Sequence, residues 1–116
     1  MRTTYHLVPA ATWAERSAKD TYAPPSLAAE GFVHCTDGEA ELLATGDRYY
    51  RDDPRPYVVL TIDLDAVGAE WGYDDPGRIY PHVHGAIPPP AVLAARRIER
   101  TADGRFVGIA PVSADA

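Results

Sequence analysis

The chain is poor in cysteine, in long apolar runs and in positive charge, and each shortage excludes a class of protein. Cys35 is the only cysteine among 116 residues, so an internal disulfide is impossible. No apolar stretch is long enough to cross a bilayer, and no charged-then-apolar signal segment opens the sequence. A formal net charge of -6 argues against binding a long phosphate backbone. We therefore expect a cytoplasmic protein that binds neither a membrane nor a long nucleic acid.

Hydrophobic periodicity predicts one domain over 1–116, with a core from about 3 to 109 and a loose tail at 110–116. The expected helical segments are Ala10–Ala18, a short turn at Leu27–Glu30, and Asp37–Tyr50. The expected strands are Thr3–Val8, Phe32–Cys35, Tyr57–Ile62, a short strand starting at Glu70–Trp71, Arg78–His84, Val92–Arg100 and Arg105–Ile109. Because helices concentrate in the first half and strands in the second, the predicted class is α+β with an antiparallel-rich sheet.

The junction after His34 is expected to face a ligand, because a predicted strand ends there and a predicted helix begins. Thr36 with Glu39 three residues later is typical of a capping box. The backbone N–H groups at 36–38 would then be free to bind an anion. Ser26 is expected to be the N-cap of its short turn, and Gly31 to end it.

All four histidines lie in predicted strands. Alternation along the strand places Tyr80, His82 and His84 on one face. A solvated sheet face would explain these three residues without a ligand. His6 alone is typical of a core histidine that donates to a backbone carbonyl. Four histidines on strands of so short a chain nevertheless favour a shared site.

Three chemical uses of such a site are open. His82 and His84, with His6 or His34, offer imidazoles to a metal ion, although no carboxylate joins that run and we expect no metal. Cys35 near a helix start is a possible nucleophile, but a small buried thiol is the favoured interpretation. The third use is ligand orientation, in which imidazoles donate to the hydroxyls or phosphates of a nucleotide.

Three segments resemble a known family. They are Tyr5–Pro9, Pro25–Thr36 with its Gly-Phe-Val-His-Cys-Thr block, and Pro81–Pro88. Together they are similar to the bacterial domain-of-unknown-function family 952, over nearly the whole chain from about residue 3 to 98. The family name itself carries no activity.

That family in turn resembles a compact ADP-ribosyltransferase fold, near the RNA 2'-phosphotransferases. The resemblance implies a split sheet that binds NAD, with His6 on the ribose and His34 at the second polar position. Gly85–Pro89 of this chain resembles a Gly-x-Ile-Pro-Pro turn that often follows a late strand in that fold. The position of the usual glutamate falls near Tyr80, which cannot act as a carboxylate. His82, one side-chain repeat along, is the candidate acid/base instead.

The leading hypothesis is therefore an NAD-like nucleotide site with ADP-ribosyl- or phospho-transferase chemistry. His34 and His82 are the candidate catalytic residues; the candidate cofactor-binding residues are His6, Ser26, Thr36 and Tyr80. Two alternatives stay open: a non-catalytic domain that binds a small metabolite, and a histidine-based metal-dependent enzyme. The expected partner is a small nucleotide or metabolite, and the expected state is a monomer or weak homodimer.

Overall fold

The computed structural model describes residues 1–16 and 20–111. Its strands are β1 (Thr3–Pro9), β2 (Val33–His34), β3 (Tyr57–Asp63), β4 (Trp71–Tyr73), β5 (Pro81–Val83), β6 (Val92–Arg100) and β7 (Phe106–Ile109). Its α-helices are α1 (Ala10–Glu15), α2 (Pro25–Glu30) and α3 (Glu39–Tyr49), with 3-10 turns at Leu64–Ala66 and Pro89–Ala91. None of the helices in the described ranges is long and apolar enough to cross a membrane.

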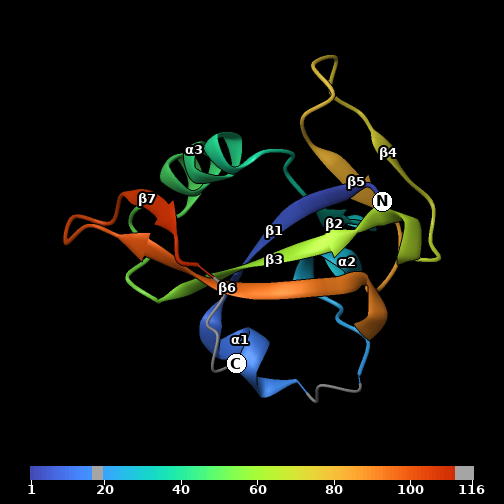
Figure 1. Ribbon diagram of the computed structural model, residues 1–116, viewed down its shortest axis with the longest axis horizontal. Coiled ribbons are helices and arrows are strands. Elements are labelled where there is room, and N and C mark those ends of the chain that lie inside the picture. The colour runs from blue at the N-terminus through green and yellow to red at the C-terminus, as the bar shows by residue number, and fades with distance from the viewer. Residues whose placement is uncertain (17–19, 112–116) are drawn as a thin grey trace.

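The strands form two antiparallel sheets, in the order β1-β3-β6-β7 and β2-β5-β4. An isolated backbone bridge between Tyr5 and Thr36 links β1 of one sheet to the segment that follows β2 of the other. In Figure 1, α3 and α1 lie on opposite sides of the long curved strands β1, β3 and β6. The predicted α+β class with antiparallel strands is therefore confirmed.

Alternation along β1 divides the core into two clusters. Thr4, His6 and Val8 are buried on one face, and Tyr5 and Leu7 pack on the other, as alternation on a strand requires. The larger cluster lies between the two sheets and includes Val8, Tyr22, Val33, Cys35, Leu60, Ile62, Val83 and Ile87. The smaller cluster lies under α3 and comprises Leu42, Tyr57, Val59, Ile98 and Phe106.

Both predicted N-caps are wrong. Thr36 does not cap α3, because its backbone N–H donates to Tyr5 and its carbonyl accepts from Tyr5, which keeps it extended. The N-cap is Gly38, whose φ of 89° suits glycine. Ser26 lies inside α2, which begins one residue earlier because Pro25 is well placed at the first helical position. Gly31, with φ 88°, ends α2 as expected.

The expected strand Arg78–His84 is too long. Arg78 has a left-handed φ of 53° and its N–H bonds back to Asp75, so the segment before Pro81 turns rather than extends. The Asp75 carboxylate accepts the next two backbone N–H groups, so only Pro81–Val83 pair as β5. Upstream, the expected short strand starting at Glu70–Trp71 is β4, which spans Trp71–Tyr73.

The strand over Val92–Arg100 is confirmed with the predicted bounds. The expected helix Ala10–Ala18 is shorter, since α1 ends at Glu15 and Arg16 is extended; Ala18 lies outside the described residues. Of the expected loose tail, Ala110 still donates to the Arg97 carbonyl, and 112–116 lie outside the described residues.

Candidate functional site

His6 is a buried histidine with both ring nitrogens occupied. Its Nδ1 lies 2.6 Å from the His34 carbonyl oxygen and its Nε2 lies 2.7 Å from the Tyr22 hydroxyl. A carbonyl can only accept, so Nδ1–H donates to His34 and Nε2 accepts from Tyr22. Burial, which disfavours the imidazolium, lowers the pKa of His6 to about 4. His6 is therefore neutral at physiological pH and holds one tautomer.

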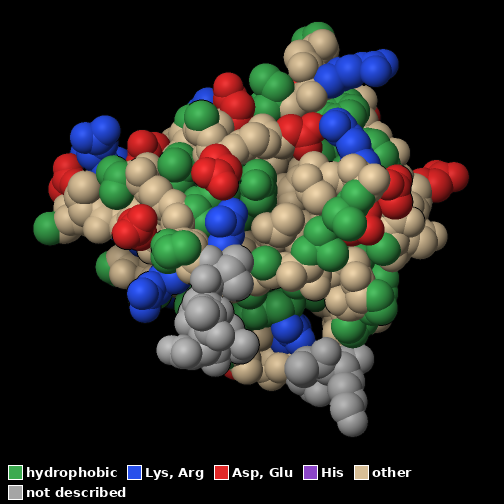
Figure 2. All heavy atoms as spheres, viewed as in Figure 1, with side chains coloured by type: hydrophobic (Ala, Val, Ile, Leu, Met, Phe, Trp, Pro, Cys, Tyr) green, Lys and Arg blue, Asp and Glu red, His purple; other side chains and the backbone are tan. Residues whose placement is uncertain are grey.

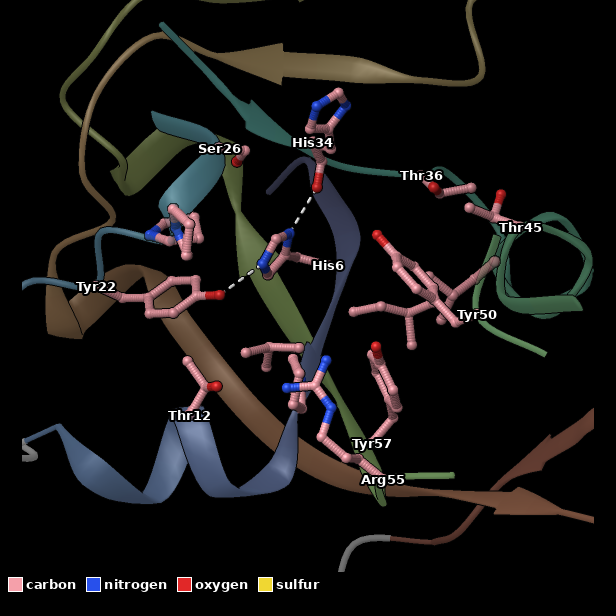
Figure 3. Close-up of a pocket in the computed structure, with 16 residues that line it drawn as sticks. His6, Thr12, Tyr22, Ser26, His34, Thr36, Thr45, Tyr50, Arg55 and Tyr57 are labelled. Atoms are coloured by element: carbon pink, nitrogen blue, oxygen red, sulfur yellow. Dashed lines mark hydrogen bonds between the residues drawn. The ribbon is translucent and has the colours of Figure 1, made fainter. Parts of the chain in front are cut away.

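The histidines do not form one constellation. Figure 3 shows the His34 carbonyl pointing toward His6 while the His34 ring lies on the opposite side of the chain. His6 and His34 both line one pocket, but β2 presents the backbone carbonyl of His34 to His6 and the His34 ring to the other face. His6 reaches a ribose hydroxyl only if the Tyr22 hydroxyl moves.

The His34 and His82 rings do meet. The two residues are direct partners across β2 and β5, and their ring centroids lie 5.5 Å apart. The ring of Phe32 stacks on His82 at 3.9 Å and 14°. His84, farther along, is exposed, and its ring centroid lies 6.0 Å from that of Phe32.

Each of these two imidazoles has a carboxylate partner. His82 Nδ1 lies 2.8 Å from Asp74, and His34 Nε2 lies 2.8 Å from Glu30. A carboxylate that accepts from one ring nitrogen fixes the tautomer and leaves the other nitrogen basic. The His82 side chain is 17% exposed and that of His34 is 53% exposed. His82 is thus the more enclosed and better oriented of the two.

Two adjoining pockets meet at His34, and His82 lines the second of them. The first, which we call the Tyr22 pocket, has a volume of about 300 Å³ (Figure 3). Its polar lining is His6, Thr12, Tyr22, Ser26, His34, Thr36, Thr45, Tyr50, Arg55 and Tyr57. The second, the His82 pocket, has a volume of about 540 Å³. It is lined by His34, Cys35, Thr36, Thr45, Arg48, Tyr49, Tyr50, Asp74, Asp75, Tyr80 and His82.

The two pockets share a wall made of His34, Thr36, Thr45 and Tyr50. The expected site residues divide between them: His6 and Ser26 line the Tyr22 pocket, Tyr80 and His82 line the His82 pocket, and the remaining two line both. Tyr80 lies beside Arg48, and hydrogen bonding to Tyr80 raises the pKa of that exposed guanidinium.

Two of the three backbone N–H groups of the expected anion site at 36–38 are already bonded. The backbone N–H of Thr36 donates to Tyr5 and that of Asp37 donates to Ile79. The Asp37 carboxylate also accepts from Arg2 at 3.0 Å, and from Tyr73. Donors that are already bonded cannot serve a phosphate, so Thr36 contributes to the pockets by its position in their shared wall.

Cys35 is the buried thiol that the sequence favours. It is 2% exposed, and burial raises its pKa to about 12, so it is not a thiolate at neutral pH. Within residues 1–16 and 20–111, no group of three or more His, Cys, Asp or Glu side chains is placed to hold a metal ion.

Sequence reasoning missed several residues of the site. Glu30 contacts His34, four positions later, and Asp74 contacts His82, eight positions later. Only the four-residue spacing is short enough to suggest a contact from the sequence. Thr45, Arg48 and Tyr49 come from α3, where spacing of three to four residues places side chains on one face. Arg55 follows from no local signal, because a loop brings it to the Tyr22 pocket.

The fold matches that of a bacterial protein of known structure. The crystal structure of protein CC0527 from Caulobacter crescentus superposes with a TM-score of 0.74 at 21% identity, over 91% of this chain and 94% of that one. The solution NMR structure of CC0527 gives a TM-score of 0.66 at 20% identity, over 90% of each chain. At this identity the likeness shows a common fold only.

A search of curated proteins finds no match to the chain. The family described as "Protein of unknown function (DUF952)" matches residues 7–95, a span that runs from the end of β1 into β6 and holds all three α-helices. The chain therefore belongs to the DUF952 family.

Proposed function

We propose that the chain binds NAD or a related nucleotide across the Tyr22 and His82 pockets. The observation that carries the proposal is the shared wall of His34, Thr36, Thr45 and Tyr50, which places two pockets of ligand size side by side. A dinucleotide has two ring-bearing halves, and each pocket offers tyrosine rings and hydroxyls to one of them.

We further propose that His82 transfers a proton in an ADP-ribosyltransferase-like reaction. The support is the Asp74 contact at 2.8 Å, which leaves Nε2 as the basic nitrogen, and the position of His82 in a pocket wall. In the reaction, the bond between ribose C1′ and nicotinamide breaks with its electrons on the leaving ring. The acceptor oxygen bonds to C1′, and its proton passes to Nε2 of His82.

The second candidate function is binding without turnover, and Tyr80 favours it. Tyr80 lines the His82 pocket, and the resemblance to the transferases implies that their usual glutamate falls near it. A phenol does not polarise an acceptor hydroxyl as a carboxylate does. On this candidate the pockets are a nucleotide sensor. The two candidates differ in turnover and agree on where the ligand sits.

An NMR titration with NAD tests the binding step through the imidazole resonances. We expect saturable shifts at His34 and His82, which line the pockets, and none at His84, which lines neither. The absence of shifts at millimolar NAD would exclude both candidates.

Release of nicotinamide then separates the candidates. On the transferase proposal His82→Asn slows release by about 10²-fold or more, as loss of a general base does, with binding retained. The matched control is His84→Asn on the same strand end, which is expected to leave the rate unchanged. Binding with no release in the parent protein would favour the sensor.

A further inference from the structure

The Tyr22 pocket carries an unusual charge for this chain. Among its described lining residues, Arg55 is the only Arg, Lys, Asp or Glu, although the chain as a whole has a formal net charge of -6. His6 adds no charge, because its Nδ1–H donates to a carbonyl and its Nε2 accepts from Tyr22. A pocket with one cation and no carboxylate in its lining favours an anion.

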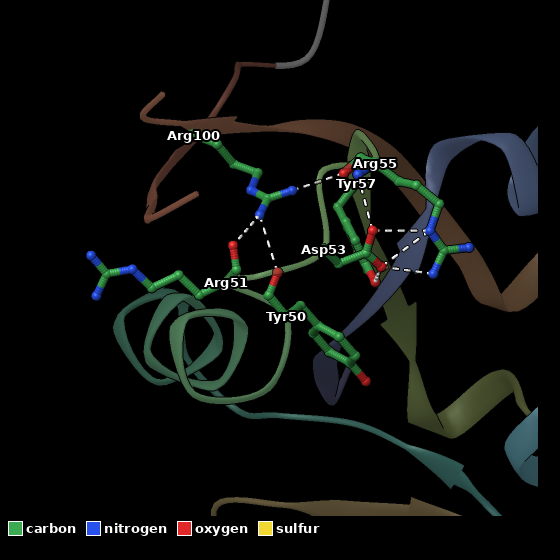
Figure 4. Close-up of polar contacts among 6 residues, drawn as sticks. All are labelled: Tyr50, Arg51, Asp53, Arg55, Tyr57 and Arg100. Carbon is green, nitrogen blue, oxygen red and sulfur yellow. Dashed lines mark hydrogen bonds and ion pairs between the residues drawn. The ribbon is translucent and has the colours of Figure 1, made fainter. Parts of the chain in front are cut away.

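Arg55 is held in a fixed orientation. Its Nε lies 3.1 Å from the Asp53 carboxylate oxygens and its Nη2 lies 2.7 Å from Oδ2, while the Tyr57 hydroxyl donates to the same carboxylate at 2.7 Å (Figure 4). These contacts leave Nη1 outside the ion pair. A planar guanidinium fixed on one edge loses little entropy when the other edge binds an anion.

The position of Arg55 defines one end of the pocket. Figure 3 shows Arg55 beside Thr12 and Tyr57 at the end next to α1, and Ser26 and His34 at the opposite end. The Thr12 hydroxyl is therefore a second donor available on the same side as the guanidinium.

The His82 pocket has the opposite balance. Its lining holds Arg48 with two carboxylates, Asp74 and Asp75. A ligand that spans both pockets thus meets a cation at the α1 end and an excess of carboxylates at the other end. Such a gradient orients a ligand by its charge.

We propose that the α1 end of the Tyr22 pocket is an anion subsite, in which Arg55 binds a phosphate group of the ligand. This inference rests on the proposed function, because it names the part of the nucleotide that enters this pocket first. The ligand class is a nucleotide whose terminal phosphate lies at Arg55 and whose uncharged or cationic ring lies toward His82, because the internal pyrophosphate of a dinucleotide would lie at the shared wall.

AMP and adenosine test the subsite, because they differ by one phosphate. Calorimetric titration of the parent protein is expected to show tighter binding of AMP than of adenosine. Arg55→Gln is expected to weaken AMP by roughly tenfold to a hundredfold, the loss of one charge-assisted contact, and to leave adenosine unchanged. The matched control is Arg51→Gln. Arg51 lies in the same loop and also pairs with an aspartate, Asp103, but it does not line the Tyr22 pocket.

Asp53→Asn distinguishes the effect of the Arg55 charge from the effect of the ion pair on the structure of the loop. It breaks the same ion pair as Arg55→Gln but keeps the cation, so the preference for AMP is expected to persist or increase. Loss of the preference in both variants would overturn the subsite in favour of a structural role for the pair. Equal affinity of the parent protein for AMP and adenosine would overturn the subsite alone, whereas no binding of either would overturn the proposed function with it.

Discussion

At the scale of single residues, two buried hydrogen bonds of His6 occupy both of its ring nitrogens. Strand alternation predicted correctly that His6 shares a face with Val8. Its partners Tyr22 and the His34 carbonyl lie 16 and 28 positions away, so no local pattern could reveal that both nitrogens are occupied. A pattern in the sequence thus gives the side of the strand, and the tertiary fold gives the hydrogen bonds.

His6 predicts a pH dependence of stability. Its pKa is about 4 in the folded protein against 6.5 when exposed, so the unfolded chain binds the proton more readily. The free energy of unfolding should be unaffected by His6 above pH 6.5 and should fall between pH 6.5 and about 4, by up to about 1.4 kcal/mol per pH unit. Urea unfolding across this window measures the slope.

His6→Gln is the informative variant, because a neutral amide retains a donor for the His34 carbonyl and cannot titrate. The slope between pH 6.5 and about 4 should flatten in His6→Gln and persist in His84→Gln, whose parent side chain is exposed. An unchanged slope in His6→Gln would show that other groups cause the acid destabilisation.

At the scale of secondary-structure elements, the contact of α3 with β7 depends on the absence of a side chain. A Cβ built on Gly46 would clash with the ring of Phe106. Gly46→Ala gains up to about 1 kcal/mol of helix propensity but overpacks the smaller core cluster, at a cost of about 1–3 kcal/mol. We expect net destabilisation, measured by thermal unfolding.

A double-mutant cycle provides the control for this contact. In a Phe106→Ala background the clash is gone, so Gly46→Ala should become neutral or stabilising. The same loss of stability in both backgrounds would mean that α3 does not pack on Phe106 as described.

The loop that carries Arg55 is tied to the β6–β7 hairpin by Arg100. Its guanidinium donates to the carbonyls of Tyr50, Arg51 and Arg55 at 2.8 to 3.2 Å (Figure 4). It also donates to the Gly104 carbonyl at 3.1 Å. Arg100→Met keeps the stem but removes the donors, and we expect it to cost about 1.5–3 kcal/mol. Amide exchange at 51–56 should accelerate as well. Arg97→Met, at an exposed position of the same strand, is the control and should change neither.

Element boundaries show where local signals fail. The strand over Val92–Arg100 was predictable because a hairpin partner follows it in sequence. The cap at Thr36 was not, because a bridge to Tyr5, 31 positions earlier, competes for its backbone. Likewise Arg78, with its positive φ, delays the start of the predicted strand for a reason that only the Asp75 turn explains.

At the scale of the whole molecule, the sequence predicted the class and the family, and the structure supplied the arrangement. Charges of both signs are dispersed over the face in Figure 2. The candidate residues were named from the sequence, but the fold divides them between two pockets. That division required contacts distant in sequence.

The central claim is that one ligand occupies both pockets, and Thr45 tests it most directly. Thr45 lines both pockets, whereas its neighbour Ala44 is exposed on α3 and lines neither. Calorimetric titration with NAD should show that Thr45→Trp lowers affinity by about tenfold or more, while Ala44→Trp binds like the parent protein. Equal NAD affinity in the parent and both variants would contradict the account, because an indole in the shared wall would then obstruct nothing.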